Sequence, residues 1–559
     1  FIGSSSSLAG MYHLYQIREG GARIETATVD STTTFNQGFT NATGGTIDGG
    51  LIKSGPGTLR FLTDNRYTGA SILNAGTLTS WGTGDTPFGC GPVTINGGTL
   101  EIAPSGSGAN LALSLAHGDT ANTVTVGPGV SMLRAARGNH VSLSVTLGAA
   151  DAAADSVLTR DTHGVLAIWP GAGTSTLGDT EKVIVNGGVA TVNGVVPTVF
   201  GIHNDDRRSC DFLAYDAADG FKLAAYTAGL GGGDTSIANV TANASTDSVH
   251  VHALRVHNGA VLTVNSGQTL TVGDGVNPAG VILNNSSSVT AGLNGGTLDF
   301  GTSEGIIMYS LQRANQYGPT LGSVITGSNG LTLVGGGQAG GLQLTAAANT
   351  YTGPTRIMAG RVSLANSRGF SDGDVYIYGN EAWGGQFRVT FTGNVTNTLH
   401  LAGVGAGTSQ QLGAVVFERD SEISGPIELM RDTRVSVSVL AGAIGTLSGP
   451  ITGPGGLEIG CPDAVIAGTV RLTGANTYGG GTRVSRGTLE IAAQDSLAPG
   501  QITVNNGVLA FALNGDVTIT NAIRGVGRVV QKGSGTLTLT DAESFAGTFE
   551  IQAGALVVE

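Results

Sequence analysis

One pattern recurs four times in this chain of 559 residues, with the same internal spacing each time. Each copy has an aromatic residue, a glycine two residues later and a second glycine nine residues after the aromatic. The copies are Tyr67/Gly69/Gly76, Tyr351/Gly353/Gly360, Tyr478/Gly480/Gly487 and Phe545/Gly547/Gly554. Such recurrence is typical of proteins that stack one structural unit per repeat, because a single unit is too small to bury an apolar face alone. The pattern therefore predicts a stacked architecture.

The residues around the second glycine predict short strands that are entered through a tight corner. In the third copy, Gly487 is followed by Thr-Leu-Glu-Ile over residues 488–491, where polar and apolar side chains alternate. Glycine adopts positive φ without a steric penalty, and alternation is typical of a half-buried strand. Strands this short are stable only beside neighbours. We expect an all-β chain in which the aromatic and glycine residues of the four copies form its repeated turns and corners.

The composition excludes three other classes of chain. Glycine accounts for 93 residues but proline for only 15, and glycine does not recur at every third position, which excludes collagen. A disordered chain would be more highly charged and less apolar than this one, in which 12% of residues are charged and 40% hydrophobic. A helical protein is disfavoured because each glycine inside a helix costs about 1 kcal/mol.

The segments that contain the pattern resemble a known repeat. Residues 330–365 and 455–492 are similar to the autotransporter-associated β-strand repeat, also called the passenger-associated transport repeat, and residues 51–80 and 526–559 follow the same pattern. The resemblance implies a right-handed parallel β-helix that is secreted or exposed on the surface of a Gram-negative-type bacterium. With some 20–25 residues per turn of the helix, the chain would form a rod of about 25 turns. A β-propeller is the main competing architecture, but its blades are longer and carry aromatic signatures that this sequence lacks.

Two regions depart from the repeat and divide the chain into four parts. Residues 1–45 predict a cap or an assembly arm, and residues 46–202 predict a first stretch of β-helix. Residues 203–235 concentrate charged and aromatic residues and predict a protruding loop or a small subdomain. Residues 236–559 predict further β-helix with the later repeats.

Charge, hydropathy and cysteine content limit the expected partners. Lys and Arg number 27 against 40 Asp and Glu, for a net charge of −13 without a basic stripe, so nucleic acid is not an expected partner. No stretch approaches 18 consecutive apolar residues, so we expect no membrane-spanning helix. Cys90, Cys210 and Cys461 include no Cys-x-x-Cys pair, and whether two of them form a disulfide stays open. We expect no cofactor.

The charged segment supplies the candidate contact site. The residues that we expect to contact a glycan or a calcium ion are Asp205, Asp206, Asp211 and Tyr215. Parallel β-helix enzymes use carboxylate clusters for acid–base chemistry or to hold calcium, and tyrosine rings stack on sugars. The competing interpretation is a solvated charged loop. No residue set nominates a catalytic or metal site, since His250 and His252 share one face of a strand but lack further ligands at a matching spacing.

These features lead to one main hypothesis about function. The chain is expected to be a non-catalytic extracellular rod, which acts as a surface adhesin or a structural fibre subunit and binds a surface glycan or a protein receptor. Residues 547–559 read as an ordinary repeat rather than a polar cap, which leaves two interpretations: the chain is a fragment of a longer protein, or another molecule closes its end, as in head-to-tail self-association into filaments. The alternative is a carbohydrate-active β-helix enzyme, a polysaccharide lyase or glycosidase, that uses Asp205, Asp206 and Asp211. A third hypothesis is a passenger whose only role is translocation across the outer membrane.

Overall fold

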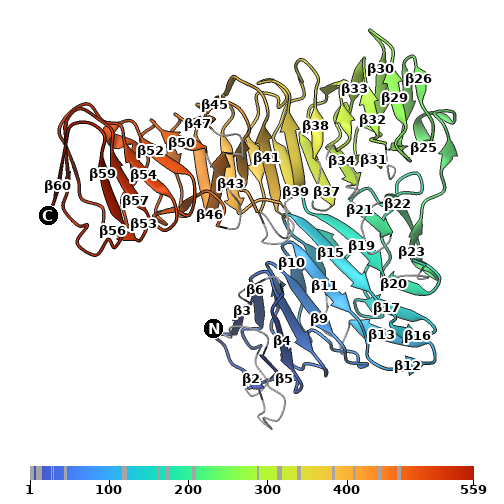
Figure 1. Cartoon of the computed structure of the whole chain (residues 1–559). Coiled ribbons are helices and arrows are strands. Elements are labelled where there is room, and N and C mark those ends of the chain that lie inside the picture. Colours follow the sequence, from blue (N-terminus) through green and yellow to red (C-terminus); the bar gives the residue numbers. More distant parts are fainter. Residues whose placement is uncertain are drawn as a thin grey trace. The chain divides into compact units, whose positions relative to one another are not determined.

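The fold is all-β. The computed structural model describes residues 6–7, 15–26, 28, 30–42, 47–115, 123–161, 163–171, 176–203, 209–285, 289–310, 318–336, 341–379, 384–406, 411–437, 442–462 and 468–559. Regular structure in these residues is β-strand, apart from two three-residue 3-10 segments, η1 (Gly233–Thr235) and η2 (Gln494–Ser496) (Figure 1). No helix in this part of the chain is long and apolar enough to cross a membrane.

The chain divides into two compact units, each with its own apolar core. Unit 1 reaches to Gly292 and includes Phe300–Gly318, and unit 2 comprises Leu293–Asp299, Pro319–Gly379 and Gly384–Glu559. The core of unit 1 is a continuous cluster of buried aliphatic and aromatic side chains, among them Leu59, Phe61 and Leu100.

Unit 1 is built from sheets of short, mostly parallel strands. The largest sheet contains, in spatial order, β1 (Ser6–Ser7), β4 (Thr32–Phe35), β7 (Thr58–Phe61), β9 (Thr77–Ser80), β11 (Gly98–Ile102), β15 (Val130–Ala135), β19 (Val165–Pro170), β21 (Val199–His203), β22 (Ser209–Asp216) and β23 (Gly220–Leu223). A second sheet contains β18 (Leu158–Arg160), β14 (Val124–Val126), β10 (Val93–Ile95), β8 (Ser71–Leu73), β6 (Leu51–Ser54) and β3 (Ala22–Glu25).

Smaller sheets complete the first part of unit 1. They are β13 (Leu111–Leu115) with β17 (Leu143–Leu147) and β20 (Glu181–Val185), β2 (Tyr15–Ile17) with β5 (Phe39–Asn41), and β12 (Ser107–Gly108) with β16 (Asn139–His140). The later strands of unit 1 are β24 (Thr227–Ala228), β25 (Ile237–Val240), β26 (Ala244–Thr246), β27 (Val249–Val251), β28 (Ala253–Val256), β29 (Val261–Val264), β30 (Thr269–Val272), β31 (Ala279–Leu283) and β34 (Gly305–Ser310).

Unit 2 contains two long parallel stacks and a shorter one. The first holds β35 (Thr320–Leu321), β37 (Leu331–Gly336), β38 (Leu342–Leu344), β39 (Thr355–Leu364), β40 (Val375–Ile377), β41 (Gly385–Val389), β43 (Leu399–Gly403), β44 (Val415–Phe417), β46 (Ile427–Val437), β48 (Ile451–Thr452), β49 (Leu457–Ile459), β51 (Thr482–Val484), β53 (Ile502–Val504) and β56 (Ile523–Gly525). The second holds β42 (Asn394–Val395), β45 (Ser421–Ile423), β47 (Ile444–Leu447), β50 (Thr469–Leu472), β52 (Thr488–Ile491), β54 (Val508–Phe511), β57 (Arg528–Gln531) and β59 (Thr548–Ile551). The third holds β55 (Val517–Ile519), β58 (Thr536–Leu539) and β60 (Ala555–Val558), and β33 (Thr297–Asp299) pairs in parallel with β36 (Val324–Thr326).

The register of these stacks explains the spacing of the sequence repeat. Thr469 of β50 pairs in parallel with Thr488 of β52, which pairs with Val508 of β54, then Arg528 of β57 and Thr548 of β59 (Figure 1). Each step is therefore 19 or 20 residues of chain. We call one such step, from a strand to its parallel neighbour in the same stack, a rung. Parallel pairing needs a crossover between strands, which these rungs supply with further strands and corners instead of helices.

Apolar side chains form columns along the stack because the register is constant from rung to rung. Val470, Leu489, Leu509 and Val529 occupy successive positions of one column, and each is at most 1% exposed. Burying such side chains contributes about 1.5–3 kcal/mol each relative to leaving them in water. The alternating pattern of the sequence thus places one face of each short strand inside the stack.

Rungs in the middle of unit 1 are longer than the 20–25 residues predicted for the chain. Leu100 of β11 pairs with Leu133 of β15, and Leu133 pairs with Ile168 of β19. The additional length is used for extra strands: β12 and β13 lie between β11 and β14, whereas β14 itself pairs with β10, the one strand between β9 and β11. The buried column of Leu100, Leu133 and Ile168 continues from rung to rung, and the additional residues of each rung lie outside it.

The described part of the charged segment 203–235 packs into unit 1 as antiparallel strands. β22 pairs antiparallel with β21 and with β23, unlike the parallel stacks around it. Phe212, Leu213 and Phe221 are fully buried there. Buried apolar side chains hold the described strands within unit 1, and the protruding loop or small subdomain expected for residues 203–235 stays a prediction.

Candidate functional site

The aromatic residue of the repeat is buried at the corner of a rung. Tyr67 and Tyr478 are 0% exposed and Tyr351 is 3% exposed. In each of these three copies the phenol hydroxyl shares a hydrogen bond with the hydroxyl of a Ser or Thr four residues later. The pairs are Tyr67–Ser71 (2.5 Å), Tyr351–Thr355 (2.5 Å) and Tyr478–Thr482 (2.7 Å). Burial raises the pKa of all three phenols, that of Tyr478 to about 12, so they stay protonated at physiological pH.

A buried asparagine two residues before each tyrosine ties successive rungs together. Its Oδ1 accepts a hydrogen bond from a backbone N–H of the preceding rung, and its Nδ2 donates to a backbone carbonyl of the following rung. These bonds join Asn65 to Phe39 (2.9 Å) and Pro87 (2.7 Å), Asn349 to Ile325 (2.8 Å) and Gly369 (2.6 Å), and Asn476 to Ile451 (2.9 Å) and Ser496 (2.6 Å). This asparagine is not part of the pattern predicted from the sequence, although the three copies share the spacing Asn-x-Tyr-x-Gly-x-Ser/Thr that identifies it.

The first glycine of each repeat lies against the backbone of the preceding rung. At all four positions an added Cβ would come closer than 3 Å to a backbone atom of that rung. Such a Cβ would lie 2.3 Å from the Asp48 carbonyl oxygen at Gly69, 2.8 Å from the Gly330 nitrogen at Gly353, 2.3 Å from the Gly456 nitrogen at Gly480 and 2.1 Å from the Gly527 carbonyl oxygen at Gly547. Any side chain here would push two rungs apart, so this glycine is required by close packing.

The second glycine of each repeat is required by its backbone conformation. The angle φ is +70° at Gly76, +80° at Gly360, +70° at Gly487 and +66° at Gly554, in the left-handed region that residues with a side chain rarely adopt. Gly76, Gly487 and Gly554 each stand at a bend directly before a strand, where the sequence analysis placed a corner.

Gly360 differs from the turn that the sequence analysis predicted for it. It lies inside β39, which runs unbroken from Thr355 to Leu364. The pairing of β39 with β37 shifts register just before it, between Leu333 and Val334, as at a β-bulge. Hydrogen bonding to neighbouring strands on both sides of the bulge keeps the chain in a strand there, so the positive φ of Gly360 redirects β39 without ending it.

The fourth copy replaces the polar corner with an apolar one. Phe545 stands in place of tyrosine, Glu543 in place of asparagine and Phe549 in place of the Ser or Thr. The two phenylalanine rings meet edge to face, with centroids 5.2 Å apart. The hydroxyl and its partner are thus lost together, which leaves no polar group of the pair unsatisfied.

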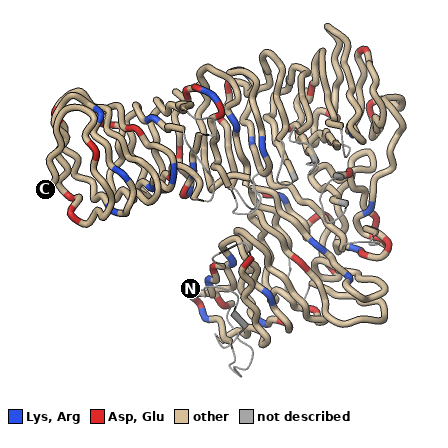
Figure 2. Tube along the Cα trace, viewed as in Figure 1, with Lys and Arg blue, Asp and Glu red and all other residues tan. Residues whose placement is uncertain are grey.

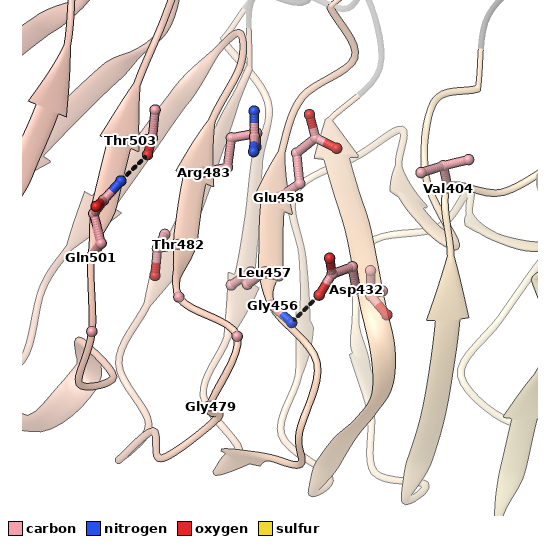
Figure 3. A pocket seen from close by; sticks show the side chains of 14 residues that line it. Val404, Asp432, Gly456, Leu457, Glu458, Gly479, Thr482, Arg483, Gln501 and Thr503 are labelled. Atoms are coloured by element: carbon pink, nitrogen blue, oxygen red, sulfur yellow. Dashed lines mark hydrogen bonds between the residues drawn. The ribbon is translucent and has the colours of Figure 1, made fainter. Parts of the chain in front are cut away.

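A groove lies beside the third repeat corner, on the outer side of unit 2. It has a volume of about 330 Å³ and follows the rungs of β46, β49, β51 and β53 (Figure 3). Its floor is rich in glycine, including Gly456, Gly480 and Gly481, and polar side chains stand around it. The concave surface forms because these positions carry no side chain.

Two rows of side chains, set by the strand register, define the groove. Thr433, Leu457, Thr482 and Ile502 are paired in sequence across the four strands. The residues just before them form the corner row, which is Asp432, Gly456, Gly481 and Gln501. The residues just after them form the strand row, which is Arg434, Glu458, Arg483 and Thr503. The corner row therefore has a side chain at each end and two glycines between them.

The polar groups of the groove differ in how far they are already bonded. Glu458 accepts from Arg434 Nε (3.0 Å) and from the Ser485 hydroxyl (2.5 Å), so both carboxylate oxygens are engaged. Asp432 accepts from the Gly456 N–H (2.8 Å) through Oδ1. Arg483 is exposed and makes no hydrogen bond or ion pair with the part of the chain that the structure describes. Figure 2 shows basic and acidic residues interspersed along unit 2, without an extended run of one sign.

The two described residues of the sequence-predicted contact site have partners inside unit 1. Asp211 is 4% exposed, pairs with Arg255, and accepts a hydrogen bond from the Tyr226 hydroxyl (2.8 Å). The Tyr215 hydroxyl accepts from the Val185 N–H and donates to the Val185 carbonyl. These contacts favour a structural role for both side chains. Asp205 and Asp206 lie outside the described residues.

The other groups considered from the sequence have no site around them in the described chain. His250 Nε2 lies 2.7 Å from the carbonyl oxygen of Gly273, and burial lowers the pKa of His252. Within the described ranges, no three His, Cys, Asp or Glu side chains are placed to hold a metal ion. Cys90, Cys210 and Cys461 are buried, and burial raises the pKa of Cys210 to about 12.

The chain belongs to the class of all-β proteins built from stacked parallel strands with a repeated aromatic–glycine pattern. Comparison with known proteins is consistent with this class. Four segments match the family model described as "Passenger-associated-transport-repeat", at residues 51–79, 338–364, 467–491 and 529–558. The chain thus carries four passenger-associated transport repeats, one around each aromatic–glycine pattern, and the resemblance drawn from the sequence is confirmed.

Part of the chain also resembles a curated protein. It is similar to "Adhesin BmaC autotransporter" from Brucella suis biovar 1 (strain 1330), with 34% identity over 123 residues. This match covers 21% of the present chain and 3% of the relative, so the chain corresponds to a small part of that protein's length. No solved structure matches the chain.

Proposed function

We propose that the stacked strands form a right-handed parallel β-helix and that the chain is part of a secreted or surface-exposed passenger region with an adhesive role. The organism would be a Gram-negative-type bacterium. The observation that carries the proposal is the presence of passenger-associated transport repeats at the corners of parallel rungs. The similarity to a protein named an adhesin supports the same role.

The physical basis of the role is rigidity. The rungs of unit 2 are held to their neighbours by parallel ladder bonds and by columns of buried aliphatic side chains, and asparagine bridges add to these at Asn349 and Asn476. A stack held in this way keeps its outer side chains in fixed positions, and a fixed arrangement lowers the entropy cost of binding a partner surface. The proposal requires no catalytic group.

Localisation and adhesion are tested in the bacterium that encodes the chain. Antibodies to unit 2 are applied to intact cells before and after mild protease treatment, and attachment to cultured epithelial cells is compared between the parent strain and a strain lacking these residues. We expect labelling of intact cells that protease removes, and reduced attachment of the deletion strain. Labelling only after permeabilisation, or unchanged attachment, would contradict the proposal.

End-to-end association of copies stays a prediction. The described surface on which it would depend is formed by β59 and β60, where Phe549 is 38% exposed, Ile551 54% and Val558 43%. Sedimentation at rising protein concentration, for the parent chain and for an Ile551→Glu variant, measures it. Head-to-tail assembly predicts a concentration-dependent increase in mass that the variant lacks.

A further inference from the structure

We infer that the groove of unit 2 binds one residue of an uncharged saccharide, held between the side chains of Asp432 and Arg483. The inference rests on the proposed adhesive role, for which it names the class of ligand and the place where the ligand binds. No part of it involves the charged segment 203–235 of unit 1.

The shape of the groove follows from the register. Asp432 and Gln501 are the two ends of the corner row, and they are three rungs apart, which is about 14 Å at the usual spacing of neighbouring strands. Gly456 and Gly481 between them leave the surface open, and Glu458 and Arg483 of the strand row border the opening on one side. The result is a slot with polar ends and a backbone floor (Figure 3). Its volume of about 330 Å³ lies at the lower end of the range of small-molecule sites.

The groups that face the slot combine hydrogen-bond donors with acceptors. Asp432 Oδ1 accepts from the Gly456 N–H, and its second carboxylate oxygen has no hydrogen bond within the described chain. Arg483 presents a guanidinium group with no partner in the same residues. The Gln501 side chain donates through Nε2 to the Thr503 hydroxyl (3.0 Å), so the amide oxygen of Gln501 takes no part in this bond. Neighbouring sugar hydroxyls act as donors and acceptors together, so a carboxylate and a guanidinium on either side of the ring satisfy both roles.

The charge balance and the position of the groove argue against other ligands. Glu458 forms an ion pair with Arg434, so among the described residues the unpaired charges at the groove are those of Asp432 and Arg483. These two charges are opposite and sum to zero, which favours an uncharged ligand over an anion or a cation. A peptide strand would add to an open sheet edge, whereas β49 and β51 have hydrogen-bonded neighbours on both sides. Nucleic acid is disfavoured by the net charge of −13.

The affinity of one groove is expected to be weak. The lining residues include no aromatic ring on which a sugar could stack, so binding depends on hydrogen bonds that replace those to water. We expect a Kd on the order of 1 mM, which becomes effective at a cell surface where many copies act together.

Saturation-transfer NMR on the full chain tests the inference. The probes are galactose, glucose, mannose, fucose, N-acetylglucosamine and N-acetylgalactosamine, with N-acetylneuraminic acid and glucuronic acid as the charged comparison. We expect saturable binding of at least one uncharged sugar. In the variants Arg483→Met and Asp432→Asn we expect the Kd to rise at least fivefold. Neither side chain is buried, and the amide oxygen introduced by Asp432→Asn can still accept from the Gly456 N–H, so both variants should keep the thermal midpoint of the parent chain.

Matched controls come from the same unit. Asp516 accepts a backbone N–H of the next rung (Thr536, 2.7 Å) as Asp432 does, and Arg528 is an exposed arginine away from the groove. Asp516→Asn and Arg528→Met should leave sugar binding unchanged. The inference is overturned if no uncharged sugar binds saturably, if only the acidic sugars bind, or if the control variants weaken binding as much as the groove variants.

The same variants separate this inference from the proposed adhesive role. If attachment to epithelial cells requires the chain but none of the sugars binds, the groove inference fails and the adhesive role stands. If the sugar binds the groove but the chain makes no difference to attachment, the adhesive role fails and the saccharide site stands.

Discussion

At the first three repeat corners, one asparagine side chain bridges the rung before it and the rung after it. Asn476 joins the Ile451 N–H to the Ser496 carbonyl, and all three groups are buried. Backbone groups at a corner lie outside the regular ladder, and leaving one of them buried without a partner costs about 1–3 kcal/mol. The side chain therefore replaces ladder bonds where the strand turns.

Replacing this asparagine should open the corner locally. For Asn476→Ala we expect a loss of about 2–4 kcal/mol in the local opening free energy, because two buried backbone groups lose their partner. Hydrogen exchange followed by mass spectrometry measures it as faster exchange in peptides that contain Ile451. The exposed Asn506 provides the control, and equal effects of Asn506→Ala and Asn476→Ala would contradict the bridging role.

The tyrosine hydroxyl and its Ser or Thr partner should be energetically coupled. Tyr478→Phe is expected to destabilise unit 2 by about 1 kcal/mol, and Thr482→Val by a similar amount. Each change removes one hydroxyl of the pair and leaves the other hydroxyl buried without its hydrogen-bond partner. The double variant should cost less than the sum, because the fourth copy already has phenylalanine at both positions. A double-mutant cycle of urea unfolding measures the coupling, and simple additivity would refute it.

The pattern found in the sequence contains the aromatic and glycine residues of the four repeats, including Gly360 inside β39, but not the polar residues that bond at the corners. Glycine and aromatic residues are identical or similar in all four copies, whereas the asparagine and the hydroxyl are replaced in the fourth by Glu543 and Phe549. A pattern defined on all four copies therefore omits them. Their function becomes visible only when the bonds of Asn65, Asn349 and Asn476 are compared.

At the scale of the elements, charged side chains on neighbouring strands form ladders across the outer faces of the rungs. Glu490 of β52 accepts hydrogen bonds from Arg471 of β50 (2.7 Å) and from Lys532 after β57 (2.9 Å). Burial by itself would raise the pKa of this carboxyl, but the two cationic partners outweigh burial and hold the pKa below its ordinary value. A carboxyl with a lowered pKa in the folded state stabilises that state above its ordinary pKa, and this contribution is lost as the pH falls through the folded-state pKa.

This ladder gives a pH-dependent prediction. Glu490→Gln should lower the thermal midpoint at pH 7, and the difference from the parent chain should shrink as the pH falls below about 4.5, the ordinary pKa of a glutamate. Circular dichroism melts from about pH 3 to pH 7 measure it. The exposed Glu543→Gln serves as the control, and a difference between parent and Glu490→Gln that does not change with pH would count against the ladder.

The sequence predicts short strands and their stacking, whereas the protruding loop or small subdomain expected for residues 203–235 stays a prediction. Alternation of apolar and polar residues predicts one buried face, and β50 and β58 show that alternation directly. In the charged segment the same apolar signal is present in Phe212, Leu213 and Phe221, beside a high density of charge. Burial of the apolar residues decides the placement of the described part, because charged side chains can still reach water from a strand.

At the scale of the whole molecule, the groove shows where prediction from sequence ends. Asp432 and Gln501 belong to different rungs and are 69 positions apart in sequence, and they face one slot only because three successive registers align. A shift of one residue in any of these pairings would turn a groove side chain toward the core. Periodicity gives the length of a rung but not which residue of one rung meets which residue of the next.

The regular register of unit 2 predicts that a complete rung can be removed. Val508 pairs with Arg528, so deletion of residues 508–527 brings the next rung into the place of the missing one. We expect this variant to keep its β-sheet circular dichroism and its resistance to protease, whereas deletion of residues 508–517 alone should abolish both. Equal tolerance of the two deletions would show that the register is not what holds the stack.

The one-rung register also has a mechanical consequence. Along the second stack of unit 2, β52, β54 and β57 each bond to the strand one rung before and one rung after. A pull on the chain at one end of such a stack peels off the outermost rung first, so the stack should yield in steps and release about twenty residues, about 70 Å of extended chain, at each step. Every step dissipates work while the remaining rungs stay folded. A domain of this kind can absorb a pull, such as fluid flow on an attached cell, without losing its whole structure at once.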